Sequence, residues 1–338
     1  MRTVHYSEIL YGTAALAGLS PGDLDAAAFG LLRTFHDRRL QVAWEIHRWP
    51  DVCPIEQRYY RPLYAAATAY VAGNERYDLP TGHYFQALRA TTGNAPTVAG
   101  VENSAYWAEC KNGYDAPDWV TNTAYAVGAQ VKDPLTGYYY QVHTIYPAAI
   151  ALIDLTKLGR LTPFNRYIPY TQTGSTSIGE FLTATNRDPR ITTQTTSFPF
   201  WLSADGAQFS SPAPNTLWLY FRTRRDTLTG NAWDSTAAYA SGDQVYFAAT
   251  SGGVGDFYTA NQSTTAGQSP ATSAAKWTVV SLPYFLRGYL IQGGFADWLI
   301  SDGQTDKAAA HEAFALEFLE LEADKLQRQQ QQVGRLKL

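Results

Sequence analysis

The stretch Tyr239-Ala240-Ser241-Gly242-Asp243-Gln244-Val245-Tyr246 occurs, with changes, three times in the chain. The other two copies are Tyr70-Val71-Ala72-Gly73-Asn74-Glu75-Arg76-Tyr77 and Tyr125-Ala126-Val127-Gly128-Ala129-Gln130-Val131-Lys132. Each copy has a tyrosine, two small residues and a glycine, and a cluster of aromatic residues follows it. Such self-similarity indicates a repeated structural unit, which has to be recognised before any other feature.

The repeat predicts a small β module. The glycine allows a turn with unusual backbone angles, and the alternating aromatic residues favour a short, half-buried strand. We therefore expect three-stranded modules of about 40 to 50 residues, close to the lower size limit for independent folding. Copies one and three close on Trp107 and Trp277, whereas copy two loses the pattern after Thr144. The signature residues are Tyr70, Gly73, Tyr125, Gly128, Trp233, Tyr239, Gly242, Asp243, Tyr258 and Trp277.

The third copy resembles the small chitin- and cellulose-binding modules, whose pattern is Trp, Tyr-x-x-Gly-Asp-x-Val, Tyr-x-Ala, Thr-x-Gly-x-x-Pro and Trp. The matching residues are Trp233, Tyr239, Gly242, Asp243, Val245, Tyr258, Ala260, Gly267, Pro270 and Trp277. In that family, exposed aromatic residues after the Tyr-x-Ala strand stack on sugar rings. Here that place holds Asn261-Gln262-Ser263, and Leu88-Arg89-Ala90 in copy one. The resemblance thus implies the fold without its binding platform, and we expect the copies to be structural or surface decorations.

Composition narrows the function classes. With 45% apolar and 17% charged residues the chain can bury ample core, and a net charge of -4 leaves no overall basic surface for nucleic acid. The histidines have no metal-ligand spacing, and we expect no cofactor, no metal and no enzyme activity. Asp188 with Asp205, or Glu102 with Glu109, are the weak candidates for the paired carboxylates of a glycosidase. Cys53 and Cys110 are interpreted as free thiols, with a single disulfide as the alternative.

The two ends of the chain carry helical patterns. Residues 7–49 have a cap signal at Ser20-Pro21, and a last helix begins near Asp306. Two apolar stripes at helical spacing are expected to be buried against each other. Their residues are Leu24, Ala28, Leu31, Phe35, Val42 and Ile46 in the first, and Ala310, Phe314, Phe318, Leu321 and Lys325 in the second, which Leu316, Leu319, Ala323 and Leu326 widen.

These observations predict an α+β multidomain fold. The N- and C-terminal segments form a helical bundle, which carries inserted small β modules and a β domain. The expected boundaries are 1–64 with 283–338 for the helical framework, 65–112 for the first repeat, 113–145 for a degenerate second repeat, 146–230 for the central β domain and 231–282 for the third repeat. In the central domain, Ser197–Leu202 and Thr216–Arg222 are strand candidates with a hairpin-type turn at Ala204-Asp205-Gly206-Ala207 between them. No stretch is apolar enough for a signal peptide or a membrane span, so we expect synthesis in the cytosol.

The two ends resemble the head-to-tail adaptor (connector) proteins of tailed bacteriophages. The likeness is carried by Tyr6-Ser7-Glu8-Ile9-Leu10 through Trp44-Glu45-Ile46-His47-Arg48-Trp49-Pro50, and by Leu282-Pro283-Tyr284-Phe285-Leu286 to Ala296-Asp297-Trp298-Leu299. This resemblance implies a structural virion protein of the neck, assembled in the bacterial cytoplasm. It also implies a homo-oligomeric, dodecameric ring that binds the portal protein and a tail or neck completion protein. DNA would pass through the ring without specific binding.

Two groups of candidate binding residues follow from this resemblance. The tail after the last helix is expected to bind the portal through Gln327, Arg328, Gln329, Gln330, Gln331, Gln332, Arg335 and Lys337, although a frayed helix end has the same composition. Glu312, Glu317 and Glu320 are most simply the solvated face of the last helix, and in a ring around DNA they would form an acidic lining of the channel. The alternative function is a carbohydrate-binding protein, for chitin or a cell-surface glycan, or an accessory to a glycan-processing enzyme.

Overall fold

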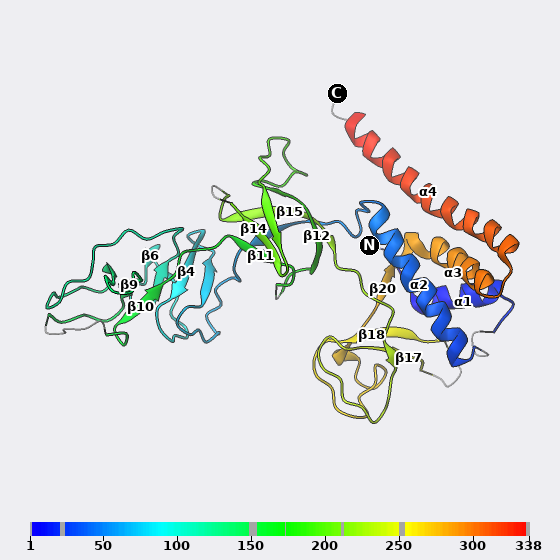
Figure 1. The fold of residues 1–338 in the computed structure, drawn as a ribbon, viewed down its shortest axis with the longest axis horizontal. Coiled ribbons are helices and arrows are strands. Elements are labelled where there is room, and N and C mark those ends of the chain that lie inside the picture. Colours follow the sequence, from blue (N-terminus) through cyan, green and yellow to red (C-terminus); the bar gives the residue numbers. More distant parts are fainter. Residues whose placement is uncertain are drawn as a thin grey trace. The chain divides into compact units, whose positions relative to one another are not determined.

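The computed structural model describes residues 2–20, 24–148, 154–172, 174–210, 213–249 and 254–335, with residues 329–335 described by their backbone alone. The chain divides into two units. Unit 1 consists of Met1–Cys53 with Arg225–Leu338, and unit 2 consists of Pro54–Arg224. Figure 1 labels the elements of both.

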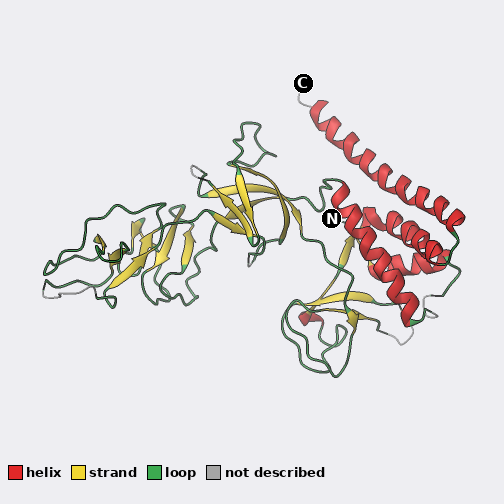
Figure 2. Ribbon diagram, in the orientation of Figure 1, coloured by secondary structure: helices red, strands yellow, loops and turns green. Residues whose placement is uncertain are grey.

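Unit 1 contains the long helices of the described residues, which Figure 2 shows gathered together. They are α1 (Tyr6–Leu16), α2 (Ala26–Ile46), α3 (Arg287–Ser301) and α4 (Thr305–Arg335), and the short 3-10 helices are η2 (Ala274–Lys276) and η3 (Tyr284–Leu286). Strand β1 (Thr3–His5) pairs antiparallel with β20 (Ser281–Pro283), so the start of the chain is joined to the residues that lead into α3. The predicted start of α4 near Asp306 is confirmed.

The expected cap at Ser20-Pro21 is wrong for α2, and Pro21 itself lies outside the described residues. The helix begins after Asp25, whose carboxylate accepts a hydrogen bond from the backbone N–H of Ala28 at 2.7 Å. This is ordinary N-capping, in which a short acidic side chain satisfies one of the unpaired N–H groups of the first turn.

Helix α3 is the centre of unit 1. It packs against α1, α2 and α4, and most of its residues are buried on every side. Two adjacent glycines make the close approach possible, because a Cβ at Gly293 would overlap Arg39 and a Cβ at Gly294 would overlap His36. A tight turn at Gly303, with φ of 77°, then reverses the chain into α4.

The third repeat also belongs to unit 1. Its sheet has the order β16-β17-β18-β19, formed by β16 (Asn231–Ala232), β17 (Gln244–Phe247), β18 (Asp256–Ala260) and β19 (Trp277–Val279). The module is fastened to the helices rather than loosely attached. The Tyr6 ring of α1 lies edge-on to Tyr246 and Phe257, and the Arg225 guanidinium pairs with Asp37 of α2 at 2.6 Å.

Unit 2 contains the other two repeats. The first has the sheet β3-β4-β7, made of β3 (Glu75–Asp78), β4 (His83–Ala87) and β7 (Trp107–Glu109), with a small hairpin of β5 (Thr97–Val98) and β6 (Val101–Glu102). The second has the sheet β8-β9-β10, made of β8 (Gln130–Lys132), β9 (Tyr139–Val142) and β10 (Leu158–Leu161). Leu158 is paired with Val142 as Trp107 is with Ala87 and Trp277 with Ala260, so a leucine takes the place of the closing tryptophan.

The rest of unit 2 is built from two three-stranded sheets. One has the order β12-β15-β2, with β12 (Ile178–Thr185), β15 (Thr216–Thr223) and β2 (Ile55–Tyr59). The other has the order β11-β14-β13, with β11 (Tyr167–Pro169), β14 (Gly206–Phe209) and β13 (Phe200–Ser203). Both contribute to one apolar cluster, which includes Phe181, Phe209 and Phe221. The expected turn at Ala204-Asp205 is confirmed, but it joins β13 to β14, whereas β15 pairs with β12 and β2.

The expected helical bundle with inserted modules is wrong as a description of this fold. Only 25% of the residues are helical, and the described residues contain four helices against many short strands in small separate sheets. The coarser statement, a mixed α+β chain, holds. The error arose because the fold class was assigned from the two helical ends. Most of the chain between them forms small β units, each with its own core cluster.

Candidate functional site

The inner faces of the helices in unit 1 are joined by a buried ionic network. Arg39 of α2 donates two hydrogen bonds to Asp297 of α3, at 2.8 and 2.9 Å, and two to Glu312 of α4, at 3.2 and 2.5 Å. Arg38 contacts the same Asp297 at 3.0 Å. Burial opposes the charge on Arg39, but its bonds to the two carboxylates outweigh this effect and raise the Arg39 pKa. Glu312, a candidate for the channel lining, is thus engaged with Arg39.

His36 lies beside this network with no exposed surface. The Thr13 hydroxyl donates to the carbonyl oxygen of Ile9 at 3.0 Å and lies 3.0 Å from His36 Nε2, while the Tyr6 hydroxyl lies 3.3 Å from Nδ1. These contacts are satisfied together when Nε2–H donates to Thr13 and Nδ1 accepts from Tyr6, which is a neutral imidazole. Burial lowers the pKa of His36 to about 4, with Arg39 also lowering it and Asp297 partly opposing the change.

The buried face of α2 combines apolar residues with His36 and Arg39, and it differs from the apolar stripe that the sequence predicted. The buried residues are Leu32, His36, Arg39, Leu40 and Ala43. By contrast, Leu31, Val42 and Ile46 are exposed, and Leu24, Ala28 and Phe35 are only partly buried. The expectation that this stripe would be buried within the chain is therefore wrong. Helical spacing grouped the stripe residues correctly, but the face that turns inward is the one that carries Leu32, Leu40 and Ala43 together with His36 and Arg39.

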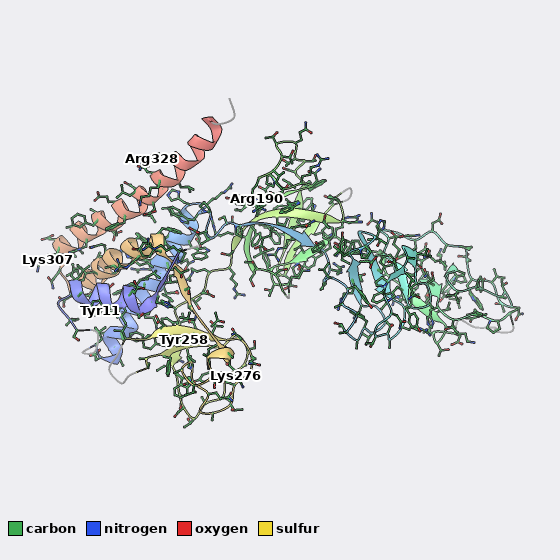
Figure 3. The ribbon with its side chains drawn as sticks, turned by 180° about the vertical axis from the view of Figure 1, so that it is seen from behind. Tyr11, Arg190, Tyr258, Lys276, Lys307 and Arg328 are labelled. Carbon is green, nitrogen blue, oxygen red and sulfur yellow. The ribbon has the colours of Figure 1, made fainter. Side chains whose placement is uncertain are left out.

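Helix α4 is oriented in the same way. Its inner face carries Ala308, Ala315 and Leu319, whereas Phe314 is 52% exposed and Phe318 and Leu321 are each 44% exposed. The last three residues lie four and three positions apart, so they share one face of the helix. Lys307 lies near the start of α4 and Arg328 in its second half, and Figure 3 labels both. We call Phe314, Phe318 and Leu321 the α4 stripe, and Leu31, Val42 and Ile46 the α2 stripe.

Two hollows flank the α4 stripe. One, of about 630 Å³, lies where the end of α1 meets the α3–α4 turn and is lined by Leu16, Phe295, Trp298, Lys307 and His311, among others. The other, of about 340 Å³, is lined by Trp49, Phe285, Lys325 and Leu326, among others. The linings do not include Phe314, Phe318 or Leu321, but both hollows are bordered by residues of α4 that precede or follow them.

The second half of α4 has few contacts within the chain. At about 1.5 Å per residue its 31 residues extend over roughly 46 Å, whereas the 15 residues of α3 extend over roughly 22 Å. Of the portal-binding candidates, Gln327 and Arg328 are exposed on this projecting part. The side chains of Gln329, Gln330, Gln331, Gln332, Arg335 and Lys337 lie outside the described residues. The channel candidates Glu317 and Glu320 are exposed on α4.

The signature residues of the repeats hold the modules together. Gly73, Gly128 and Gly242 have φ of 88°, 90° and 96°. Each donates its N–H, at 2.8 Å, to the end of the second strand of its module. The repeat tyrosines Tyr70, Tyr125 and Tyr239 each accept a hydrogen bond on their hydroxyl from the backbone five residues earlier, at 2.7 to 2.8 Å. Trp277, Trp233 and Tyr258 belong to the core cluster of the third module. Asp243 accepts from the Ala240 N–H at 2.7 Å.

Two residues of the same kind were missed in the sequence. Tyr64 and Trp119 stand six positions before the repeat tyrosine, as Trp233 does in the third copy. The backbone N–H of Tyr64 donates to the Tyr77 carbonyl at 2.9 Å, that of Trp119 to the Lys132 carbonyl at 2.7 Å, and that of Trp233 to the Tyr246 carbonyl at 2.8 Å. The constant six-residue spacing was the available signal.

One carboxylate of each pair offered as a glycosidase candidate is engaged in structural contacts. Asp188 is bound by the Arg190 guanidinium at 2.8 Å, and the two oxygens of Glu102 accept from Gln141 and from the backbone of Glu109. Among the described residues no cluster of three or more His, Cys, Asp or Glu side chains is suited to a metal ion, and no helix is long and apolar enough to cross a membrane. Cys53 and Cys110 form no disulfide with each other.

Comparison with known proteins gives no relative of this chain. No family model matches the chain, and no curated protein is similar to it in sequence. A proposal about the function therefore rests on the surfaces described above.

Proposed function

We propose that this protein is a structural component of the neck of a tailed bacteriophage, a head-to-tail adaptor that forms a homo-oligomeric ring between the portal and the tail components. The observation that carries the proposal is the outward orientation of the α2 and α4 stripes in unit 1. The side chains of the two stripes are between 40% and 52% exposed and are grouped at helical spacing on two helices, and grouped exposed apolar side chains are typical of an interaction surface. The resemblance of the two chain ends to adaptor proteins supports the same assignment.

The two stripes lie on different helices, each packed against α3. A contact between the α2 stripe of one copy and the α4 stripe of the next would join unlike surfaces. Contacts between unlike surfaces generate closed rings when the rotation between neighbours closes. The projecting end of α4, from Gln327 onward, is then available for the portal, and Glu317 and Glu320 are available for an acidic surface toward DNA.

A matched pair of leucines tests the ring contact. Leu321 is 44% exposed within the α4 stripe, and Leu316 is 46% exposed on the opposite side of the same helix. Native mass measurement and particle imaging should show that Leu321→Ser weakens ring formation while Leu316→Ser leaves it intact. Rings that survive Leu321→Ser together with Val42→Ser would reject this interface.

The portal contact is tested separately. Deleting residues 327–338 should leave the fold and the ring unchanged but weaken attachment to the portal that accompanies this protein. A protein that remains monomeric, with or without the portal ring, would count against the whole assignment. Unchanged attachment after the deletion would reject only the role of the tail.

A further inference from the structure

The outer face of the β12-β15-β2 sheet carries a row of aromatic and polar side chains. Along β15 the residues alternate: Leu217, Leu219 and Phe221 are buried in the core, whereas Trp218 and Tyr220 are half-exposed on the other face. Residues two apart in a strand lie on the same face, about 6.8 Å from each other. The two rings therefore stand side by side along the middle strand of the sheet.

Hydroxyl-bearing residues flank these rings. Trp218 is paired with Thr185 of β12, and Tyr220 is paired with Thr183 of the same strand. On the opposite side, Tyr220 is paired with Ile55 of β2. A cavity of about 350 Å³ lies over this face, lined by Ile55, Thr183, Thr185, Pro189, Thr195, Ser197, Trp218 and Tyr220.

The loop after β12 forms one wall of this cavity and is held in place. It is closed by a hydrogen bond from the Asn186 N–H to the Thr196 carbonyl at 3.2 Å and by one from the Thr196 N–H to Asn186 Oδ1 at 2.9 Å. Arg190, labelled in Figure 3, is fixed by Asp188, and its guanidinium carbon lies 5.6 Å from the centre of the Trp218 ring. These contacts fix the loop beside Trp218 before any ligand is bound, so less conformational entropy is lost when a ligand binds.

The lining is polar but carries no unbalanced charge. Within the described part of the chain, the hydroxyls of Thr183, Thr195 and Ser197 make no hydrogen bond, so they are available to a ligand. The side chains that line the cavity carry no charge, and two ion pairs lie near it, Arg190 with Asp188 and Arg222 with Glu180 at 2.7 Å. The lining itself therefore supplies no cation to a phosphate or carboxylate and no anion to a basic peptide.

We propose that this cleft is a binding site for a neutral carbohydrate, accepting one or two pyranose rings of a surface or cell-wall polysaccharide. A pyranose ring presents C–H groups on its faces, which pack on Trp218 and Tyr220. Its rim carries hydroxyl groups, which exchange hydrogen bonds with Thr183, Thr195 and Ser197. The volume lies within the range of small-molecule sites, which combine aromatic walls with a few placed polar groups.

The proposed site is independent of the three repeats and of the neck assignment. In the first and third repeats the signature aromatic side chains belong to the module cores, and the positions after the second strand hold the buried Leu88 in the first and Asn261 in the third. If the repeats bound the sugar, substitutions in β15 would leave the affinity for it unchanged. A neck protein that also binds glycan at this site would contact the host surface through unit 2.

The test is titration of the full-length protein with neutral hexasaccharides of β-1,4-glucose, β-1,4-N-acetylglucosamine, α-1,4-glucose and β-1,4-mannose, followed by calorimetry and tryptophan fluorescence. An oligogalacturonate serves as the anionic probe. We expect at least one neutral hexasaccharide to bind, and Trp218→Ala to weaken that binding by about tenfold or more. Thr183→Val and Ser197→Ala, which preserve side-chain volume, should each weaken it severalfold while the circular dichroism spectrum stays unchanged.

Trp201→Ala is the matched control, because Trp201 is 74% exposed on β13 of the other sheet and does not line the cavity. It should leave the affinity unchanged. The proposal is overturned if none of the neutral hexasaccharides binds, if only the anionic probe binds, or if the binding persists in Trp218→Ala and in both hydroxyl variants.

Discussion

The buried His36 makes a quantitative prediction about acid stability. Its folded-state pKa of about 4 lies below the ordinary value of 6.5, so the unfolded chain binds a proton that the folded chain excludes. Above pH 6.5 the residue is neutral in both states and contributes nothing to the pH dependence. As the pH falls from 6.5 to 4, the unfolded state is favoured by about 1.4 kcal/mol per pH unit, to a total of roughly 3 kcal/mol.

The assay compares the protein with His36→Gln in urea unfolding at several pH values between 7 and 4. Ellipticity at 222 nm is a suitable signal, since the four α-helices of the described residues all belong to unit 1. His36→Gln should unfold more easily at pH 7 but lose less stability on acidification, by roughly 3 kcal/mol over the whole interval. His47→Gln, at the end of α2, is the control and should retain the acid sensitivity. Equal acid sensitivity in His36→Gln and the unmodified protein would refute the reasoning.

Other residues of unit 1 and the repeats give further predictions. Asp297→Ala leaves Arg39 buried without its main partner and should lower the free energy of unfolding of unit 1 by about 3–5 kcal/mol, measured by urea unfolding; a loss below 1 kcal/mol would contradict the network. Gly242→Ala places a side chain at φ of 96° and should destabilise the third module by about 1–2 kcal/mol, measured by hydrogen exchange of β17 and β18. Asp243→Ala removes the hydrogen bond to the Ala240 N–H and should cost about 1 kcal/mol in the same assay. Because the second copy has Ala129 at the equivalent position, Asp243→Ala should still fold, and failure to fold would contradict the shared geometry of the copies.

Local features of this fold could be predicted from the sequence, whereas long-range ones could not. The tyrosine and glycine of each repeat act within a few residues of each other, so their spacing was enough to predict a turn and a strand. The pairing of β15 with β2 joins residues far apart in the chain, and no local pattern indicates it. The third strand of the second repeat was missed because Leu158 carries no signature of its own.

The candidate surfaces were predicted only in part, for a physical reason. Helical spacing gives the angle between side chains around an axis, but it does not say which side meets the rest of the protein. In α2 the inward face packs against α3, and its Arg39 pairs with Asp297 and Glu312, which come from helices far away in the sequence. The aromatic row of Trp218 and Tyr220 was likewise visible as a strand but not as a cleft, because its wall is supplied by the loop after β12.

The reversed polarity of α2 separates two kinds of selection on one helix. Positions such as Val42 and Ile46 contribute little to the folding of a single subunit, whereas His36 and Arg39 contribute much. A systematic mutational scan scored only for subunit folding should thus tolerate polar replacements at exposed apolar positions such as Val42 and Ile46. It should reject changes at His36 and Arg39. If the chain forms the ring proposed above, the same scan scored for ring assembly should show intolerance at both sets of positions, and the difference between the two maps would outline the contact between neighbouring copies.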